Sequence, residues 1–326
     1  MEPIRLGREE MVNVLPYTKP GKSPGLNKKG RAIIKNYQLY LLLLPALAYL
    51  IVFKYTPLYG IQIAFRKYTL SGGITGSEWV GLKHFITFFK SPQFSRLLSN
   101  TLILSFYELV VSFPIPVILA LLLNQITHKR TKAVLENIFY IPHFISVVVL
   151  VGMMTTFFSM QGGIVNTVLS GLGHKKINFM GEASMFRHLY VFSGVWKNAG
   201  WNAIIYIAAL SGIDQTLHEA AKVDGAGKLA RIWHVDIPGI LPTIMMMFIM
   251  AVGNVMSIGF EKAYLMQNPL NISTSEIIAT YVYKVGLQRV QYDYATAIGL
   301  FNNVINVILL LVANKVSKRL TDNSLW

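Results

Sequence analysis

The sequence predicts an all-α membrane protein with six transmembrane helices, and two observations carry this prediction. Of the 326 residues, 53% are hydrophobic and only 14% are charged, whereas soluble domains carry about a quarter charged residues. The apolar residues also gather in six runs, each close to the roughly 20 residues that cross a bilayer as a helix. Strands of a membrane barrel would be about 10 residues long with alternating hydrophobicity, and these runs do not alternate.

The six runs are spread along the whole chain. In order they are Tyr37–Phe53, Leu97–Leu123, Ile138–Phe158, Leu189–Leu210, Ile240–Phe260 and Tyr294–Asn314. A long charged segment precedes the first run and no small-residue cleavage pattern follows it, so we expect a retained helix and not a signal peptide. The fourth and sixth runs are the most polar of the six.

The distribution of Lys and Arg sets the expected orientation. These residues are more numerous in the segments that share a side with the N-terminus, and basic flanks of apolar runs mark the cytoplasmic side. The net charge of +15 therefore indicates the orientation of the chain in the membrane and does not indicate a nucleic-acid-binding groove. We expect both termini in the cytoplasm, with a mobile basic tail at 1–35, a transmembrane domain at 36–320 and a short C-terminal tail at 321–326.

Residue types also limit the chemistry that this chain can perform. The sequence has no cysteine, so disulfides, thiolate metal sites and cysteine nucleophiles are excluded. Its seven histidines are scattered without metal-ligand spacing and without a nucleophile–base pair. The sequence therefore predicts no catalytic residue and no metal site.

A polar segment at 214–239 separates the fourth and fifth runs, and most of it lies in "EAAKVDGAGKLARIWHVDIPGILP" from Glu219 to Pro242. Thr216 and Glu219 fit a capping box at the start of a helix. Gly225 stands where a glycine ends a helix, and a second helix is expected from Ala226 until Pro238 stops it. "GAGKL" is not a P-loop, because Walker A requires an earlier glycine and a Ser or Thr after the lysine, and both are missing.

The same segment resembles the EAA motif of ABC-importer permeases, the inner-membrane components of binding-protein-dependent transport. The matching residues are Glu219, Ala220, Ala221, Asp224, Gly225 and Ala226, followed by "IPGILP" from Ile237 to Pro242. "WKNAGWNAIIYIAALSGID" is similar to the carbohydrate-uptake branch, and Tyr37–Phe65 to its polysaccharide or complex-oligosaccharide subgroup. Trp233 stands where the family often has phenylalanine, which keeps an aromatic side chain at that position.

The resemblance implies a type I importer permease fold in a bacterial cell membrane, with segment 214–239 as the coupling helix region. Glu219 is then expected to contact a cytoplasmic ATPase and Gly225 to make the turn. The resemblance further implies an ATPase dimer that carries the ATP and magnesium, a second homologous permease, an external sugar-binding protein and an oligosaccharide substrate. This chain itself is expected to bind no cofactor and to hydrolyse nothing.

Polar groups within the apolar runs are candidates for the substrate pathway, because they are costly in a membrane and sugars bind to aromatic rings, amides and carboxylates. The candidates are Glu108, Asn198, Trp201, Asn202, Asn254, Glu261, Tyr264 and Asn302. Lys197 is a candidate partner for Glu108. Two alternatives stay open at this point: a proton- or sodium-driven secondary transporter, which would usually carry internal repeats, and a membrane-embedded enzyme, which would need convergent catalytic groups.

Overall fold

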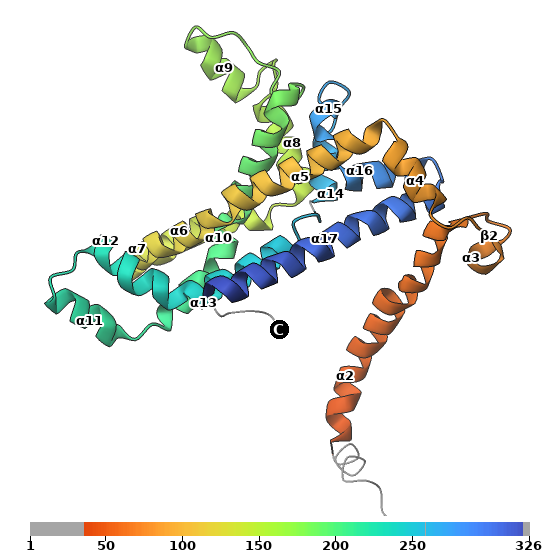
Figure 1. The fold of residues 1–326 in the computed structure, drawn as a ribbon. Coiled ribbons are helices and arrows are strands. Elements are labelled where there is room, and N and C mark those ends of the chain that lie inside the picture. Colours follow the sequence, from red (N-terminus) through yellow and green to blue (C-terminus); the bar gives the residue numbers. More distant parts are fainter. Residues whose placement is uncertain (1–35, 258, 322–326) are drawn as a thin grey trace, which may run out of the picture. The chain divides into compact units, whose positions relative to one another are not determined.

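The computed structural model describes residues 36–257 and 259–321 (Figure 1). The predicted basic tail at 1–35 and residues 322–326 of the predicted C-terminal tail lie outside the described residues. The chain divides into two compact units, Met1–Tyr59 and Gly60–Trp326.

In the first unit, α2 (Tyr37–Leu50) continues into the π-helical turn η1 (Ile51–Tyr55), and η2 (Thr56–Phe65) extends the helix into the second unit. Pro45 lies inside α2. The leucines and aromatic residues of α2 are exposed, as expected for side chains that contact lipid or another membrane helix.

The second unit is helical apart from one small antiparallel ribbon. In the ribbon, β1 (Arg66–Lys67) pairs with β2 (Glu78–Trp79). The helices follow in the order α3 (Gly73–Gly76), α4 (Lys83–Lys90), α5 (Gln93–Ser112), α6 (Pro114–Asn124), α7 (Lys129–Tyr140), η3 (Ile141–Phe144), α8 (Val147–Phe157), α9 (Ile164–Gly171), α10 (Ala183–Ser211), α11 (Gln215–Val223), α12 (Lys228–Arg231), η4 (Ile232–Asp236), α13 (Ile237–Gly253), α14 (Phe260–Met266), α15 (Ile272–Ser275), α16 (Ile278–Tyr283), η5 (Lys284–Gln288) and α17 (Tyr292–Thr321).

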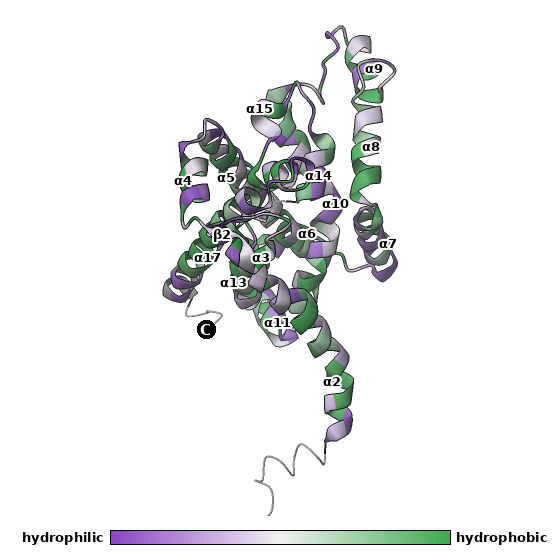
Figure 2. Ribbon diagram, turned by 90° about the vertical axis from the view of Figure 1, so that its right-hand side faces the viewer, coloured by the Kyte–Doolittle hydropathy of each residue, from purple (hydrophilic) through white to green (hydrophobic). Residues whose placement is uncertain are grey.

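Within the described residues, four continuous helical stretches are long and apolar enough to cross a membrane: Tyr37–Phe65, Gln93–Asn124, Lys228–Gly253 and Tyr292–Lys315. A fifth crossing results if Lys129–Phe144 and Val147–Phe157, which meet at 97°, count as one broken span. These stretches cover five of the six predicted runs, and Figure 2 shows their apolar residues in green. The fourth run lies in α10, which is 29 residues long but more polar. A mostly helical chain with several candidate membrane spans is thereby confirmed, while the sixth span stays a prediction.

The third predicted run is not a straight helix. It bends between η3 and α8, where Pro142 follows the last turn of α7 and has no backbone N–H to continue the ladder. Ser146 then starts α8 by accepting a hydrogen bond from the N–H of Val149 at 3.2 Å. Pro142 and Ser146 are both visible in the sequence, but the residues on either side of them are apolar, so the whole stretch was predicted as one helix.

The fifth run also begins earlier than predicted, and the expected stop at Pro238 is wrong. The helix runs from Lys228 to Gly253 without interruption. Pro238 stands in the first turn of α13, directly after the π-helical turn η4. A proline is tolerated at that position because the altered hydrogen-bond pattern of the π turn removes the need for its missing N–H.

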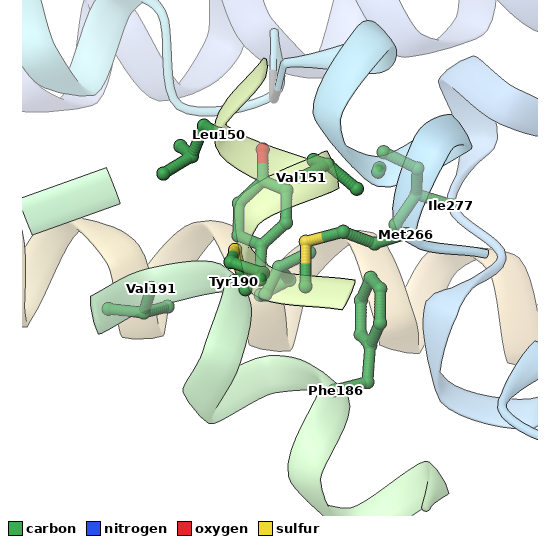
Figure 3. Packing of buried hydrophobic residues seen from close by; sticks show 10 residues of the cluster. Leu150, Val151, Phe186, Tyr190, Val191, Met266 and Ile277 are labelled. Carbon is green, nitrogen blue, oxygen red and sulfur yellow. The ribbon is translucent and has the colours of Figure 1, made fainter. Parts of the chain in front are cut away.

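The core of the second unit forms around α10. It packs on α5, α6 and α13, while α13 packs on α17. One apolar cluster joins α10 to α8 and α14 and contains the buried ring of Tyr190; Figure 3 shows this ring beside Leu150, Val151 and Met266. A second cluster joins α6, α10 and α13. These helices therefore form one packed frame that fixes the positions of the polar groups described next.

Candidate functional site: a polar cavity and an exposed loop

A cavity of about 320 Å³ opens between α5, α6, α10 and α13. Its walls combine hydroxyl, amide and carboxyl groups with apolar side chains. It is lined by Ser105, Glu108, Leu109, Ser112, Phe113, Pro116, Asn202, Tyr206, Met247, Ala251, Asn254, Val255, Ser257 and Gly259. The structure thus brings three predicted pathway residues together: Glu108, Asn202 and Asn254.

The predicted partner of Glu108 is wrong. The cation that acts on this carboxylate is Lys262, whereas Lys197 donates to the carbonyl of His143 at 2.9 Å. Glu108 Oε1 and Lys262 Nζ both lie beside Gly194, where an added Cβ would stand 3.6 Å from the oxygen and 3.1 Å from the nitrogen.

Lys262 itself is buried on α14, with 8% of its surface exposed. Its ammonium donates to the carbonyl of Tyr190 and lies 4.3 Å from the centre of the Tyr190 ring. Burial of an ammonium is tolerated when it is hydrogen-bonded and near an opposite charge. The ammonium of Lys262 therefore lies close enough to act electrostatically on the Glu108 carboxylate.

Asn198 and Trp201 face away from the other three residues, toward η3. The Trp201 ring stacks on the ring of His143 with centroids 4.4 Å apart and planes 3° from parallel. Asn198 Oδ1 lies 3.1 Å from Nδ1 of the same histidine. The backbones also approach closely, since a Cβ on Gly200 would stand 2.1 Å from the carbonyl oxygen of Phe139. This face of α10 holds the bend before α8 in place.

The remaining pathway candidates lie outside the cavity wall. Glu261 is exposed on α14. Tyr264 packs against the rings of Phe260 and Tyr283. Asn302 donates to the carbonyl of Met256 at 3.2 Å and so joins α17 to the end of α13.

The polar segment forms helix, turn and helix, as predicted, but its first cap differs. Asp214 and not Thr216 is the N-cap of α11; its side chain accepts from the N–H of Thr216 at 2.9 Å. That hydrogen bond holds the pKa of Asp214 below its usual range. The predicted capping box of Thr216 and Glu219 is therefore wrong, because the helix begins two residues earlier than predicted.

The turn after α11 is closed by Gly225, which has a φ of +78°. Its N–H donates to the carbonyl of Lys222 at 3.1 Å, and the N–H of Ala226 to that of Ala221 at 2.8 Å. This pair of bonds is a Schellman motif, in which glycine is favoured because it has no Cβ. Asp224 is the last residue before the turn.

The surface around this turn is apolar and open. Val223 is 88% exposed, Leu229 82% and Trp233 69%, and α11 has no buried residue. Glu219 and Ala220 on α11 are exposed as well. Short helices with large exposed apolar side chains need a further surface to pack on.

Sequence reasoning missed several groups at the cavity. The sequence gives no sign that the hydroxyl groups of three residues line the cavity, because each stands alone in an apolar helix. They are Ser105, Ser112 and Tyr206. Lys262 follows the fifth apolar run, so its place in the sequence suggests a loop and not a buried position. An available signal was its position in "FEKAYLM", where it shares a helical face with Ala263 and Met266, both of which are buried.

A mostly helical membrane subunit with a polar cavity and a helix–turn–helix loop matches one family. Residues 93–322 match the family described as "Binding-protein-dependent transport system inner membrane component". The chain belongs to this family, and the resemblance to ABC-importer permeases is confirmed.

Individual relatives cover almost the whole chain. The polygalacturonan/rhamnogalacturonan transport system permease protein YteP of Bacillus subtilis is 42% identical over 302 residues, 92% of this chain and 94% of the relative. The protein LplB of the same organism is 41% identical over 90% of this chain and 93% of its own length. A crystal structure of a bacterial ABC transporter for the acidic polysaccharide alginate has a chain that is 38% identical, with a TM-score of 0.84 over 90% of this chain and 100% of that chain.

Proposed function

We propose that this chain forms half of the translocation pathway of an ATP-driven importer for oligosaccharides or polysaccharide fragments. The cavity supports this proposal most directly, because Glu108, Asn202 and Asn254 converge there with several hydroxyl groups. Amides, hydroxyls and carboxylates are the groups that hydrogen-bond to sugars, and a few convergent polar groups on apolar walls are typical of ligand sites.

The cavity volume of about 320 Å³ is at the lower end of the range for ligand sites. As half of a shared pathway, the cavity would be open toward the partner subunit. A second, homologous permease would supply the opposite wall. This arrangement includes six membrane crossings, with α10 and the bent α7–α8 pair as two of them and both termini in the cytoplasm of a bacterial cell.

Uronic-acid oligosaccharides are the first substrates to test. The permease for polygalacturonan/rhamnogalacturonan and the alginate importer are each similar over at least 90% of this chain. In this chain the positive charge of Lys262 acts on Glu108, which would reduce the repulsion between this carboxylate and an acidic sugar.

The exposed segment at 214–239 would dock on a cytoplasmic ATPase. Glu219, Ala220, Ala221, Asp224, Gly225 and Ala226 would form the contact region. Val223, Leu229 and Trp233 supply apolar surface that is open in the isolated subunit, and burying such a surface is what stabilises a protein interface. An external binding protein would deliver the sugar from the opposite side; the alginate importer has been crystallised with a pentasaccharide-bound periplasmic protein.

The test is uptake of labelled oligosaccharides by cells that carry the importer with wild-type chain, without the chain, or with Asn254→Ala. We expect uptake of oligogalacturonides only with the chain present, and reduced uptake with Asn254→Ala, because a hydrogen bond to substrate is lost. Asn303→Ala is the matched control, since Asn303 is an exposed asparagine of α17 that does not line the cavity. Equal uptake with and without the chain would refute the function.

A further inference from the structure

One buried carboxylate belongs neither to the cavity wall nor to the exposed loop surface. The side chain of Asp236, in the π-helical turn η4, is 0% exposed. Its Oδ1 lies 3.3 Å from Nε2 of His218, and its Oδ2 accepts from Nε2 of Gln125 at 3.2 Å. No group in the described part of the chain hydrogen-bonds to Oδ1, so its contact with His218 is an ion pair that forms when the imidazole is protonated.

These contacts join three elements that are far apart in the sequence. His218 lies on α11, the helix with no buried residue. Asp236 lies at the end of η4, and Gln125 directly follows α6. Because α11 is otherwise almost fully exposed, the contact between His218 and Asp236 is a defined polar link between this helix and the packed frame.

Two of the three elements, α6 and the helix that contains η4 and α13, also carry residues that line the cavity. From Asp236 to Gly253 the chain is one helix with a rise of about 26 Å, and Met247 and Ala251 on it line the cavity. On α6, Pro116 lines the same cavity. A displacement of α11 that moves Asp236 is therefore carried along stiff helices to two walls of the cavity.

We propose that Asp236 is a positioning residue that makes α11, α6 and α13 move as one unit, so that movement of the ATPase is transmitted to the cavity through His218 and Gln125. The consequence of this link rests on the proposed function, because it is measured as coupling between ATP hydrolysis and transport. A buried carboxylate suits the task, since removing the cationic partner of a buried charge is strongly unfavourable.

The test measures sugar imported per ATP hydrolysed by the purified complex in liposomes. His218→Ala removes the donor on α11. We expect the ratio to fall by about 10- to 100-fold, the range for leaving a buried polar group without its partner. His218→Gln keeps a side-chain N–H donor at that position, and we expect it to restore most of the ratio.

Asn303→Ala is the control, since Asn303 is an exposed residue of α17 that lies outside segment 214–239 and does not line the cavity. The ratio should stay at the wild-type value. The double change His218→Ala with Asp236→Asn removes the charge that the single change leaves unpaired. It should improve the yield of the complex while the ratio stays low.

The inference is overturned if His218→Ala keeps the wild-type ratio, if Asn303→Ala lowers it equally, or if the double change restores yield and ratio together. The last result would assign Asp236 and His218 to stability alone. Failure of the proposed function is a different observation: the wild-type chain would not co-purify with an ATPase at all. A wild-type complex that transports, with an unchanged ratio in His218→Ala, rejects only the link.

Discussion

The turn at Gly225 allows a graded test of the coupling segment, because its geometry separates backbone strain from crowding. Gly225 has a φ of +78°, and a Cβ built on it would meet no atom within 4 Å. A side chain at this position is therefore unfavourable because of the backbone conformation and not because of a steric clash. For an L-residue this conformation is unfavourable by about 1–2 kcal/mol, more for a β-branched residue and less for asparagine.

If the turn must keep this shape when the segment docks, the strain appears in the affinity for the ATPase. We expect Gly225→Ala to weaken binding by about 5- to 30-fold, the equivalent of 1–2 kcal/mol. Gly225→Val should weaken it further and Gly225→Asn least. Insertion of the chain in the membrane should not change, because the turn is exposed.

The assay is ATPase binding by the purified variants, with stimulated ATP hydrolysis measured on the same samples. Gly227→Ala is the matched control, because Gly227 is two residues away and also has open space around it, but its φ is −67°. The reasoning is refuted if Gly227→Ala is as harmful as Gly225→Ala, or if Gly225→Val binds like the wild type.

Three further predictions concern the helices. Trp201→Ala should lower the yield and the thermal stability of the complex, by less than the roughly 3–5 kcal/mol of a buried Trp because this ring is 43% exposed. Gly200→Ala should act in the same direction through its close backbone contact. Wild-type stability with selective loss of uptake would assign Trp201 to the substrate instead. Glu108→Gln should reduce oligosaccharide uptake while ATPase binding stays normal, and unchanged uptake would remove it from the pathway. A cysteine at Lys228 should react with impermeant thiol reagents only in opened cells, and one at Gly171 in intact cells, with the reverse pattern refuting the orientation.

The sequence was informative where a local pattern determines the outcome. Apolar runs identified the membrane helices, because each helix must satisfy its backbone hydrogen bonds internally and face apolar surroundings. The glycine turn at Gly225 followed from the same kind of local rule, since a helix end in the left-handed conformation favours glycine.

The sequence was less informative where partners come from distant segments. Asn198, Trp201 and Asn202 are spaced for one face of α10, yet Asn202 lines the cavity while Trp201 stacks on a histidine in η3. Which neighbour covers each part of that face depends on the crossing of α7, α10 and α13. The partner of Glu108 was misassigned for the same reason, since Lys262 reaches it across helices.

Transport by a purified complex in liposomes tests the central claim most directly. The chain, its partner permease and the ATPase would be reconstituted with the sugar-binding protein, and labelled oligosaccharide uptake measured with ATP or with an ion gradient as the energy source. We expect that uptake requires ATP on the side of the membrane where segment 214–239 lies and requires the binding protein on the opposite side. Uptake driven by a proton or sodium gradient, without the ATPase, would contradict it and identify a secondary transporter.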